Sequence, residues 1–308
     1  MFDLQGHRGA RGLWPENTLT GFARTIELGV CALELDCGVT RDGVVVVSHD
    51  PELSPDCTRD AAGRFLEGTG PPLCTLSYQE LAAYDVGRLR PGSAYAARFP
   101  QQQGLDGERI PRLTDVLTLV RTHGRGRVRA CLEVKTFPEQ PQLTLAPEPF
   151  VAALARAVEA TGTAGLVAVI AFDWRVLACA QRLMPGVPTT ALTEEQPGED
   201  TLRLAAPRPS PWLGGLDPAR FAGSLALLVQ ASGAGTWGPD YLDVTAERVA
   251  QMHALAIKVV PWTVNEPADM QRLLTYKVDG MVSDRPDLLR ALLERQGLPL
   301  PPRPREDG

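Results

Sequence analysis

The sequence predicts an α/β fold, a TIM-type (β/α)8 barrel, from three observations. Short apolar runs alternate with amphipathic stretches along most of the chain. This alternation produces about seven or eight β-then-α units, and such units in series imply parallel strands joined by right-handed crossovers. No G-x-G-x-x-G follows the first strand, so an open dinucleotide-binding sheet is disfavoured, and about eight units in 308 residues favour a barrel.

The predicted strands are short apolar runs, many of them rich in β-branched residues and bounded by turn formers. The clearest run is ALELDCGV, which is followed by the hairpin signal Asp42-Gly43 and a second strand. In chain order, strands are expected at residues 4–6, 32–39, 44–48, 128–135, 166–171, 189–192, 258–264 and 280–283.

The predicted helices repeat apolar residues at helical spacing, and Asn17 and Thr18 are available to cap the first of them. Two further stretches, 225–229 and 241–244, have weaker patterns, and the charged, Pro-rich stretch 194–210 is expected to be a loop. In chain order, helices are expected at residues 16–28, 77–84, 113–122, 150–160, 174–183, 245–255, 268–274 and 286–295.

One long segment, residues 51–111, interrupts the alternation. It is rich in Pro, Gly, Arg and Asp, with only a short helical piece near its middle. So long an irregular connection is unusual in a compact fold unless it is functional. We therefore expect one barrel domain over residues 1–308, with residues 51–111 as a small insertion subdomain after the second strand unit.

Bulk properties exclude several classes of protein. The formal net charge of -6 argues against a nucleic-acid-binding surface, which is usually basic. No apolar run approaches the length of a membrane span, and the first ten residues do not resemble a signal peptide, so no stable membrane insertion is expected. None of the six cysteines forms a C-x-x-C pair, which favours reduced thiols and a cytoplasmic location. The oligomeric state is left open.

Three carboxylates lie in predicted strands. Glu34 and Asp36 flank Leu35, so both point to the same face of their strand. Two such neighbours stay ionised only beside a cation or a cluster of donors. Glu133, in ACLEVK, is a third, and three carboxylates with water suit Mg²⁺ or Ca²⁺. The alternative is a structural network in which these acids pair with Arg and Lys.

Two of the four histidines, His7 and His49, each end a predicted strand and precede a charged residue. In a barrel the carboxyl ends of the strands share one mouth, where the active site forms. Imidazoles titrate near neutral pH, so this pair suits acid and base roles in phosphodiester cleavage. The alternative is a packing or capping role. His123 and His253 are expected to have capping, packing or surface roles.

Four further residues are candidates for substrate contact. Arg8 and Lys135 can neutralise phosphoryl oxygens, or else pair with the carboxylates named above. Trp262, in PWTVN, can form an apolar wall at the mouth or belong to the barrel core. Asn17 can cap the first helix, contact the substrate, or do both.

In order along the chain, the strings GHRGARGLWPENTLTGF, ELDCGVTRDGVVVVSHDP, LEVK, VVPWTVN and DGMVSDRP resemble the motifs of the glycerophosphodiester phosphodiesterase family. Together they span residues 6 to 286. The resemblance implies a TIM barrel with a small insertion after the HD motif. It also implies a metal held at Glu34, Asp36 and Glu133, general acid and base roles for His7 and His49, and a phosphate near Arg8 and Lys135.

The function so implied is metal-dependent hydrolysis of a glycerophosphodiester to an alcohol and glycerol 3-phosphate, within lipid and glycerol metabolism. The expected partner is therefore a small-molecule diester, and the expected cofactor is Mg²⁺ or Ca²⁺. Two alternatives stay open, a lysophospholipid-directed phosphodiesterase of the same fold and a non-catalytic module that binds phosphorylated polyols. An exposed apolar rim on segment 51–111 would favour the lipid substrate.

Overall fold

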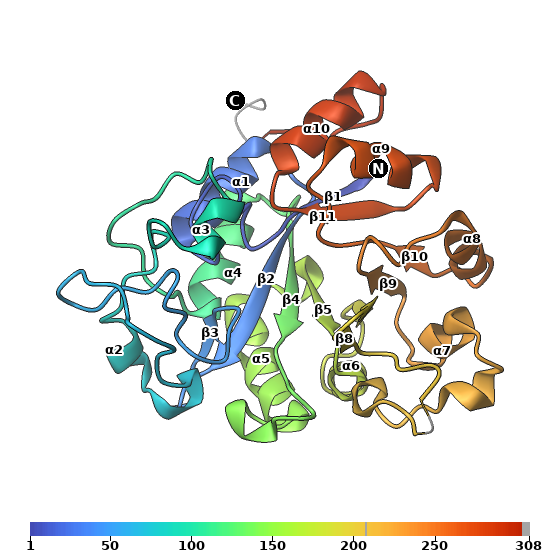
Figure 1. The fold of residues 1–308 in the computed structure, drawn as a ribbon, viewed down its shortest axis with the longest axis horizontal. Helices are drawn as coiled ribbons and strands as arrows, with labels where there is room; N and C mark the ends of the chain where they lie inside the picture. The colour runs from blue at the N-terminus through green and yellow to red at the C-terminus, as the bar shows by residue number, and fades with distance from the viewer. Residues whose placement is uncertain (207, 304–308) are drawn as a thin grey trace.

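The computed structural model describes residues 1–206 and 208–303 and contains a nearly closed, eight-strand parallel barrel (Figure 1). The strands follow the order β10-β9-β6-β5-β4-β2-β1-β11. Backbone bonds such as that from Val282 N to Pro261 O, at 2.9 Å, link the two ends of this order. The strands are β1 (Asp3–Gly6), β2 (Ala32–Val39), β4 (Arg129–Val134), β5 (Val167–Ala171), β6 (Thr189–Thr193), β9 (Thr236–Pro239), β10 (Lys258–Val259) and β11 (Gly280–Ser283).

Helices surround the strands, and the fold class expected from the sequence is confirmed (Figure 1). A ninth strand, β3 (Val45–Val47), pairs antiparallel with β2 as the hairpin signal predicted. The barrel helices are α1 (Leu19–Leu28), α4 (Leu113–His123), α5 (Pro147–Thr161), α6 (Trp174–Leu183), α7 (Leu225–Ala231), α8 (Ala246–Ala254), α9 (Pro267–Thr275) and α10 (Pro286–Arg295).

The prediction was least accurate between β6 and β11. Part of the expected loop 194–210 is a hairpin of β7 (Glu195–Gln196) and β8 (Glu199–Asp200), although residue 207 of that stretch lies outside the described residues. The weakly patterned residues 225–229 belong to helix α7, and residues 241–244 are not in a strand. The strand expected at 258–264 ends after Val259, because Pro261 has no N–H to continue the ladder.

Strand β2 explains how the barrel carries charged groups. All eight of its residues are buried. Leu33, Leu35 and Cys37 belong to the large apolar core that includes residues of α1 and α4. The alternating positions Glu34 and Asp36 face the other way, into the barrel. Covering both faces is what allows a parallel strand to hide carboxylates beside a hydrophobic core.

Segment 51–111 contains α2 (Tyr78–Leu81) and α3 (Ala94–Arg98), and it forms a small apolar cluster with Val46 of β3. The cluster consists of Val46, Leu53, Leu73, Leu81, Val86 and Ile110. We interpret this segment as the insertion that the sequence suggests. All six cysteines are free. In the described residues, no helix is both long enough and apolar enough to cross a membrane.

Candidate active site

The loop after β1 brings two predicted site residues, His7 and Arg8, to the barrel mouth. Arg8, Gly9 and Ala10 all have left-handed backbones, with φ of 48°, 72° and 60°. A Cβ on Gly9 would lie only 2.8 Å from a ring carbon of Phe22, so this position requires glycine for space as well as for conformation. The tight turn aims the Arg8 amide at Glu34 Oε2, 3.1 Å away. Left-handed non-glycine residues are often found at functional sites.

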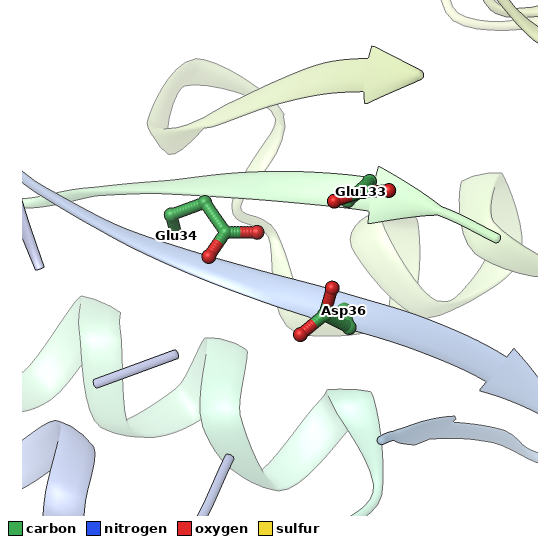
Figure 2. A group of neighbouring side chains, drawn as sticks. All are labelled: Glu34, Asp36 and Glu133. Carbon is green, nitrogen blue, oxygen red and sulfur yellow. The ribbon is translucent and has the colours of Figure 1, made fainter. Parts of the chain in front are cut away.

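Glu34 and Asp36 on β2 meet Glu133 on the neighbouring strand β4 (Figure 2). Their oxygens lie within 4.8 Å of one another, and this is the one group of metal-ligand type that the described part of the chain contains. All three residues are buried, and Glu34 Oε1 has no hydrogen-bond partner. Hard cations bind carboxylate oxygens in such an arrangement, so the donor set fits Mg²⁺ or Ca²⁺.

The charges around this cluster are unevenly compensated. Burial, followed by the charges of Asp36 and Glu133, raises the pKa of Glu34 well above its ordinary value. Burial also opposes ionisation of Asp36, but Lys135 and Arg8 hold the pKa of that carboxyl well below its ordinary value. Lys135 and Arg8 thus compensate the charge of Asp36, whereas the charge of Glu34 needs a further cation to compensate it.

His7 is buried, and its Nδ1 lies 2.6 Å from Asp284 Oδ1. Its other nitrogen, Nε2, lies 3.7 Å from Glu34 Oε2. With Nδ1 donating to Asp284, Nε2 is the atom free to exchange a proton. Burial and then the charge of Arg11 lower the pKa of His7 to about 4, although Asp284 acts in the opposite direction. The ring is therefore neutral at pH 7.

His49 follows β3 and is paired in a similar way. Its Nδ1 lies 2.7 Å from Asp50 Oδ1, and its side chain is 34% exposed. Its partial burial, followed by the charges of Arg8 and Lys135, lowers its pKa to about 4. Both histidines thus have a carboxylate at Nδ1, and both are neutral imidazoles at neutral pH.

Arg8 and Lys135 make the ion pairs that the sequence left open. Lys135 Nζ lies 3.0 Å from Asp36 Oδ1 and 2.5 Å from Glu133 Oε1. Arg8 contacts Glu16 Oε1 at 2.9 Å and Asp36 Oδ2 at 3.3 Å. Both basic residues also line the central cavity. They therefore hold the carboxylates in place and present positive charge at the mouth.

Asn17 and Trp262 differ in how well they fit the predictions. Asn17 does not cap helix α1, because Thr18 accepts the hydrogen bond from Gly21 N at 3.1 Å. Asn17 Nδ2 instead donates to Asp36 Oδ2 at 2.9 Å, and Asn17 is absent from the lining of the central cavity. Trp262 does line that cavity, and its indole Nε1 donates to Gly238 O at 2.9 Å.

Sequence reasoning missed the residue that holds His7. Asp284 accepts bonds from His7, from Arg11 Nε at 2.7 Å and from Asn265 Nδ2 at 2.8 Å. The signal was available, because Asp284 directly follows strand β11, as His7 follows β1 and Lys135 follows β4. Arg11 forms an ion pair with Asp284 in the structure, but nothing in the sequence spacing linked these two residues.

A cavity of about 430 Å³ opens at this mouth. His7, His49, Glu34, Glu133 and Lys135 all line it. A barrel mouth that combines buried carboxylates, neutral imidazoles and fixed cations defines a hydrolase site for an anionic substrate.

Comparison with known proteins identifies the family to which this hydrolase belongs. Residues 7–288 match the Glycerophosphoryl diester phosphodiesterase family, and the chain belongs to this family. It is an enzyme, a phosphodiesterase of that family. A glycerophosphodiester phosphodiesterase of Bacillus subtilis is 27% identical over 92% of this chain and 83% of its own length.

Solved structures agree with this assignment. A protein of Silicibacter pomeroyi named for the same family is 37% identical, with a TM-score of 0.86 over 97% of this chain and 95% of that one. A phosphodiesterase of Oleispira antarctica, solved with the product sn-glycerol-3-phosphate, has a TM-score of 0.67 over 94% of this chain and 96% of that one. At 20% identity, the second likeness shows the fold alone.

Proposed function

We propose that the protein hydrolyses glycerophosphodiesters to an alcohol and glycerol 3-phosphate with a divalent cation, Mg²⁺ or Ca²⁺, and the two histidines. The observation that carries this proposal is a cluster of three buried carboxylates, one with an unpartnered oxygen. Two of them, Glu34 and Glu133, line the same cavity as the two neutral imidazoles. The residues that would hold the cation are Glu34, Asp36 and Glu133. The cation supplies positive charge that stabilises the phosphoryl oxygens in the transition state.

The chain's own groups perform the rest of the reaction. Arg8 and Lys135 orient the phosphate by charge. One histidine accepts the proton of the nucleophile through Nε2, and the other donates a proton to the alcohol oxygen as its bond to phosphorus breaks. The nucleophile is water or the glycerol 2-hydroxyl, and ³¹P NMR separates the two because only the second forms a cyclic phosphate.

The proposal is tested by release of glycerol 3-phosphate from glycerophosphocholine and glycerophosphoethanolamine. Enzyme stripped with EDTA is expected to be inactive, and Mg²⁺ or Ca²⁺ is expected to restore activity. Absence of glycerol 3-phosphate from both diesters with every ion added would overturn the proposal. Soluble diesters are favoured over lysophospholipids, because none of the exposed large apolar side chains of the described residues lies in segment 51–111. The non-catalytic module is not favoured, because it would leave both imidazoles without a role.

Asp284 is proposed to position His7. Replacement by asparagine removes the charge-assisted bond and lets the imidazole take the wrong tautomer, so Asp284→Asn is expected to lower kcat about 10- to 100-fold. A shift of the pH profile of kcat should accompany the loss, because the carboxylate opposes the lowering of the His7 pKa. A variant with full kcat and an unshifted profile would assign Asp284 to structure alone.

A further inference from the structure

The central cavity has two walls of opposite electrical character. Arg8, Arg11 and Lys135 lie on the side of β1 and β4. Further around the barrel, the lining residues that follow β5, β9 and β10 include aromatic and acidic side chains. They are Phe172, Asp240, Tyr241 and Trp262. The basic wall and the carboxylate cluster account for the phosphate end of a diester, and the second wall has no role in the chemistry described above.

Asp240 is the charged group of this second wall. It is 9% exposed and lines the cavity. Its Oδ1 accepts the amide of Leu242 at 2.8 Å. Its Oδ2 has no hydrogen bond or ion pair within residues 1–206 and 208–303. This oxygen is not among the fully enclosed side-chain atoms that lack a partner, so it is open to the cavity and available to a ligand there.

Further carboxyl groups surround Asp240, and their mutual repulsion disfavours additional negative charge at this wall. Glu194, at the end of β6, has its pKa raised to about 8 by burial and then by Glu199, Asp240 and Asp243. These acidic neighbours belong to the β7–β8 hairpin and to the loop after β9. However, within the described residues this group lacks the geometry of a metal site, which only the Glu34 cluster has. The complement to this wall is therefore an organic cation.

Aromatic rings provide the rest of the wall. Phe172 and Trp262 meet edge to face, with centroids 5.4 Å apart and planes at 85°. The amide of Tyr241 donates to Trp262 O at 2.8 Å, and residues 240 and 262 are bridge partners. The rings and the carboxylate thus share one patch. Aromatic faces beside a carboxylate are the usual receptor for ammonium groups, including quaternary ones.

We propose that Asp240, Phe172, Tyr241 and Trp262 form a subsite for the alcohol head group of the diester and select head groups that bear an ammonium charge. The inference rests on the proposed function. The cavity would then match a zwitterion, with its phosphate at the basic wall and its ammonium at the acidic, aromatic wall. Selection operates on charge and on cation–π contact, so primary and quaternary ammonium groups are both accepted.

The first test uses the wild-type enzyme and two diesters of equal shape. Glycerophosphocholine is compared with its 3,3-dimethylbutyl isostere, in which carbon replaces the charged nitrogen. We expect kcat/KM to be at least about tenfold higher for the charged diester, since desolvated cation–π contacts and a carboxylate act together. Equal kcat/KM values would overturn the subsite. Absence of hydrolysis of both diesters would instead contradict the proposed function, so the two failures are distinguishable.

The second test assigns the preference to Asp240. Asp240→Asn should lower the ratio of kcat/KM between glycerophosphocholine and the isostere by about fivefold or more, by loss of the facing charge. Asp243→Asn is the matched control, because this substitution removes the same charge from a residue that is also 9% exposed. Unlike Asp240, Asp243 does not line the cavity. The control should keep the wild-type ratio. An unchanged ratio in Asp240→Asn, or an equal fall in both variants, would contradict the assignment.

Discussion

Replacing His7 or His49 by alanine is expected to lower kcat by about 10²- to 10⁴-fold, the usual contribution of general acid or base catalysis. Each imidazole is neutral at pH 7, has a carboxylate at Nδ1 and lines the cavity. Steady-state rates on a glycerophosphodiester at saturating metal measure the loss. Near-full activity of either variant would remove that histidine from the mechanism.

The acid and base roles of the two histidines can be distinguished with a substrate whose leaving group needs no proton. A p-nitrophenyl diester releases an anion that needs no proton, so the variant that lacks the acid should recover much of its rate and the variant that lacks the base should not. His123→Ala is the matched control, because His123 is exposed at the end of α4 and does not line the cavity. Its kcat should stay within about twofold of wild type.

Glu34→Gln is expected to have opposite effects on activity and on stability. The amide keeps the shape and can still accept the Arg8 amide, but it removes a charge that burial, Asp36 and Glu133 all disfavour. In EDTA, the variant should therefore have a higher Tm than wild type. Without the third carboxylate it should lose the cation and nearly all metal-dependent activity.

The pKa of Glu34 also determines whether the stability of the metal-free protein rises or falls with pH. The folded-state pKa of Glu34 is raised, so its contribution to stability is present at low pH and declines as pH rises through that pKa. Metal-free wild type should thus lose Tm toward alkaline pH more steeply than Glu34→Gln. Mg²⁺ or Ca²⁺ should raise the Tm of wild type and of the exposed control Glu294→Gln, but not that of Glu34→Gln. An equal rise in all three proteins would show that Glu34 is not a ligand.

Much of the fold was readable because its signals are local. The bounds of ALELDCGV, of residues 174–183, of residues 280–283 and of residues 286–295 were predicted without error. Each of these elements has an uninterrupted hydrophobic pattern and clear end signals, and both features can be recognised from neighbouring residues alone. Residues 225–241 were harder, because their strand, Thr236–Pro239, is short and ends in proline, which gives little β signal.

The candidate site divides in the same way. The spacing of Glu34 and Asp36 determines by itself that both carboxylates share one face of a strand, because side chains alternate along β structure. The barrel rule then places the strand-end residues His7, His49 and Glu133 at one mouth. These conclusions need only the chain's local geometry and its count of βα units.

Tertiary structure alone decided which of these groups touch. Asp284 lies 277 positions from the histidine it contacts. For Asn17 the sequence left capping and substrate contact open, but the fold turned its amide toward Asp36 and left the capping to Thr18. The acidic and aromatic wall around Asp240 likewise arises only when β5, β9 and β10 close the barrel. The physical reason is that hydrogen bonds and charge compensation depend on distances of a few ångströms, which strand order and closure establish and sequence spacing does not.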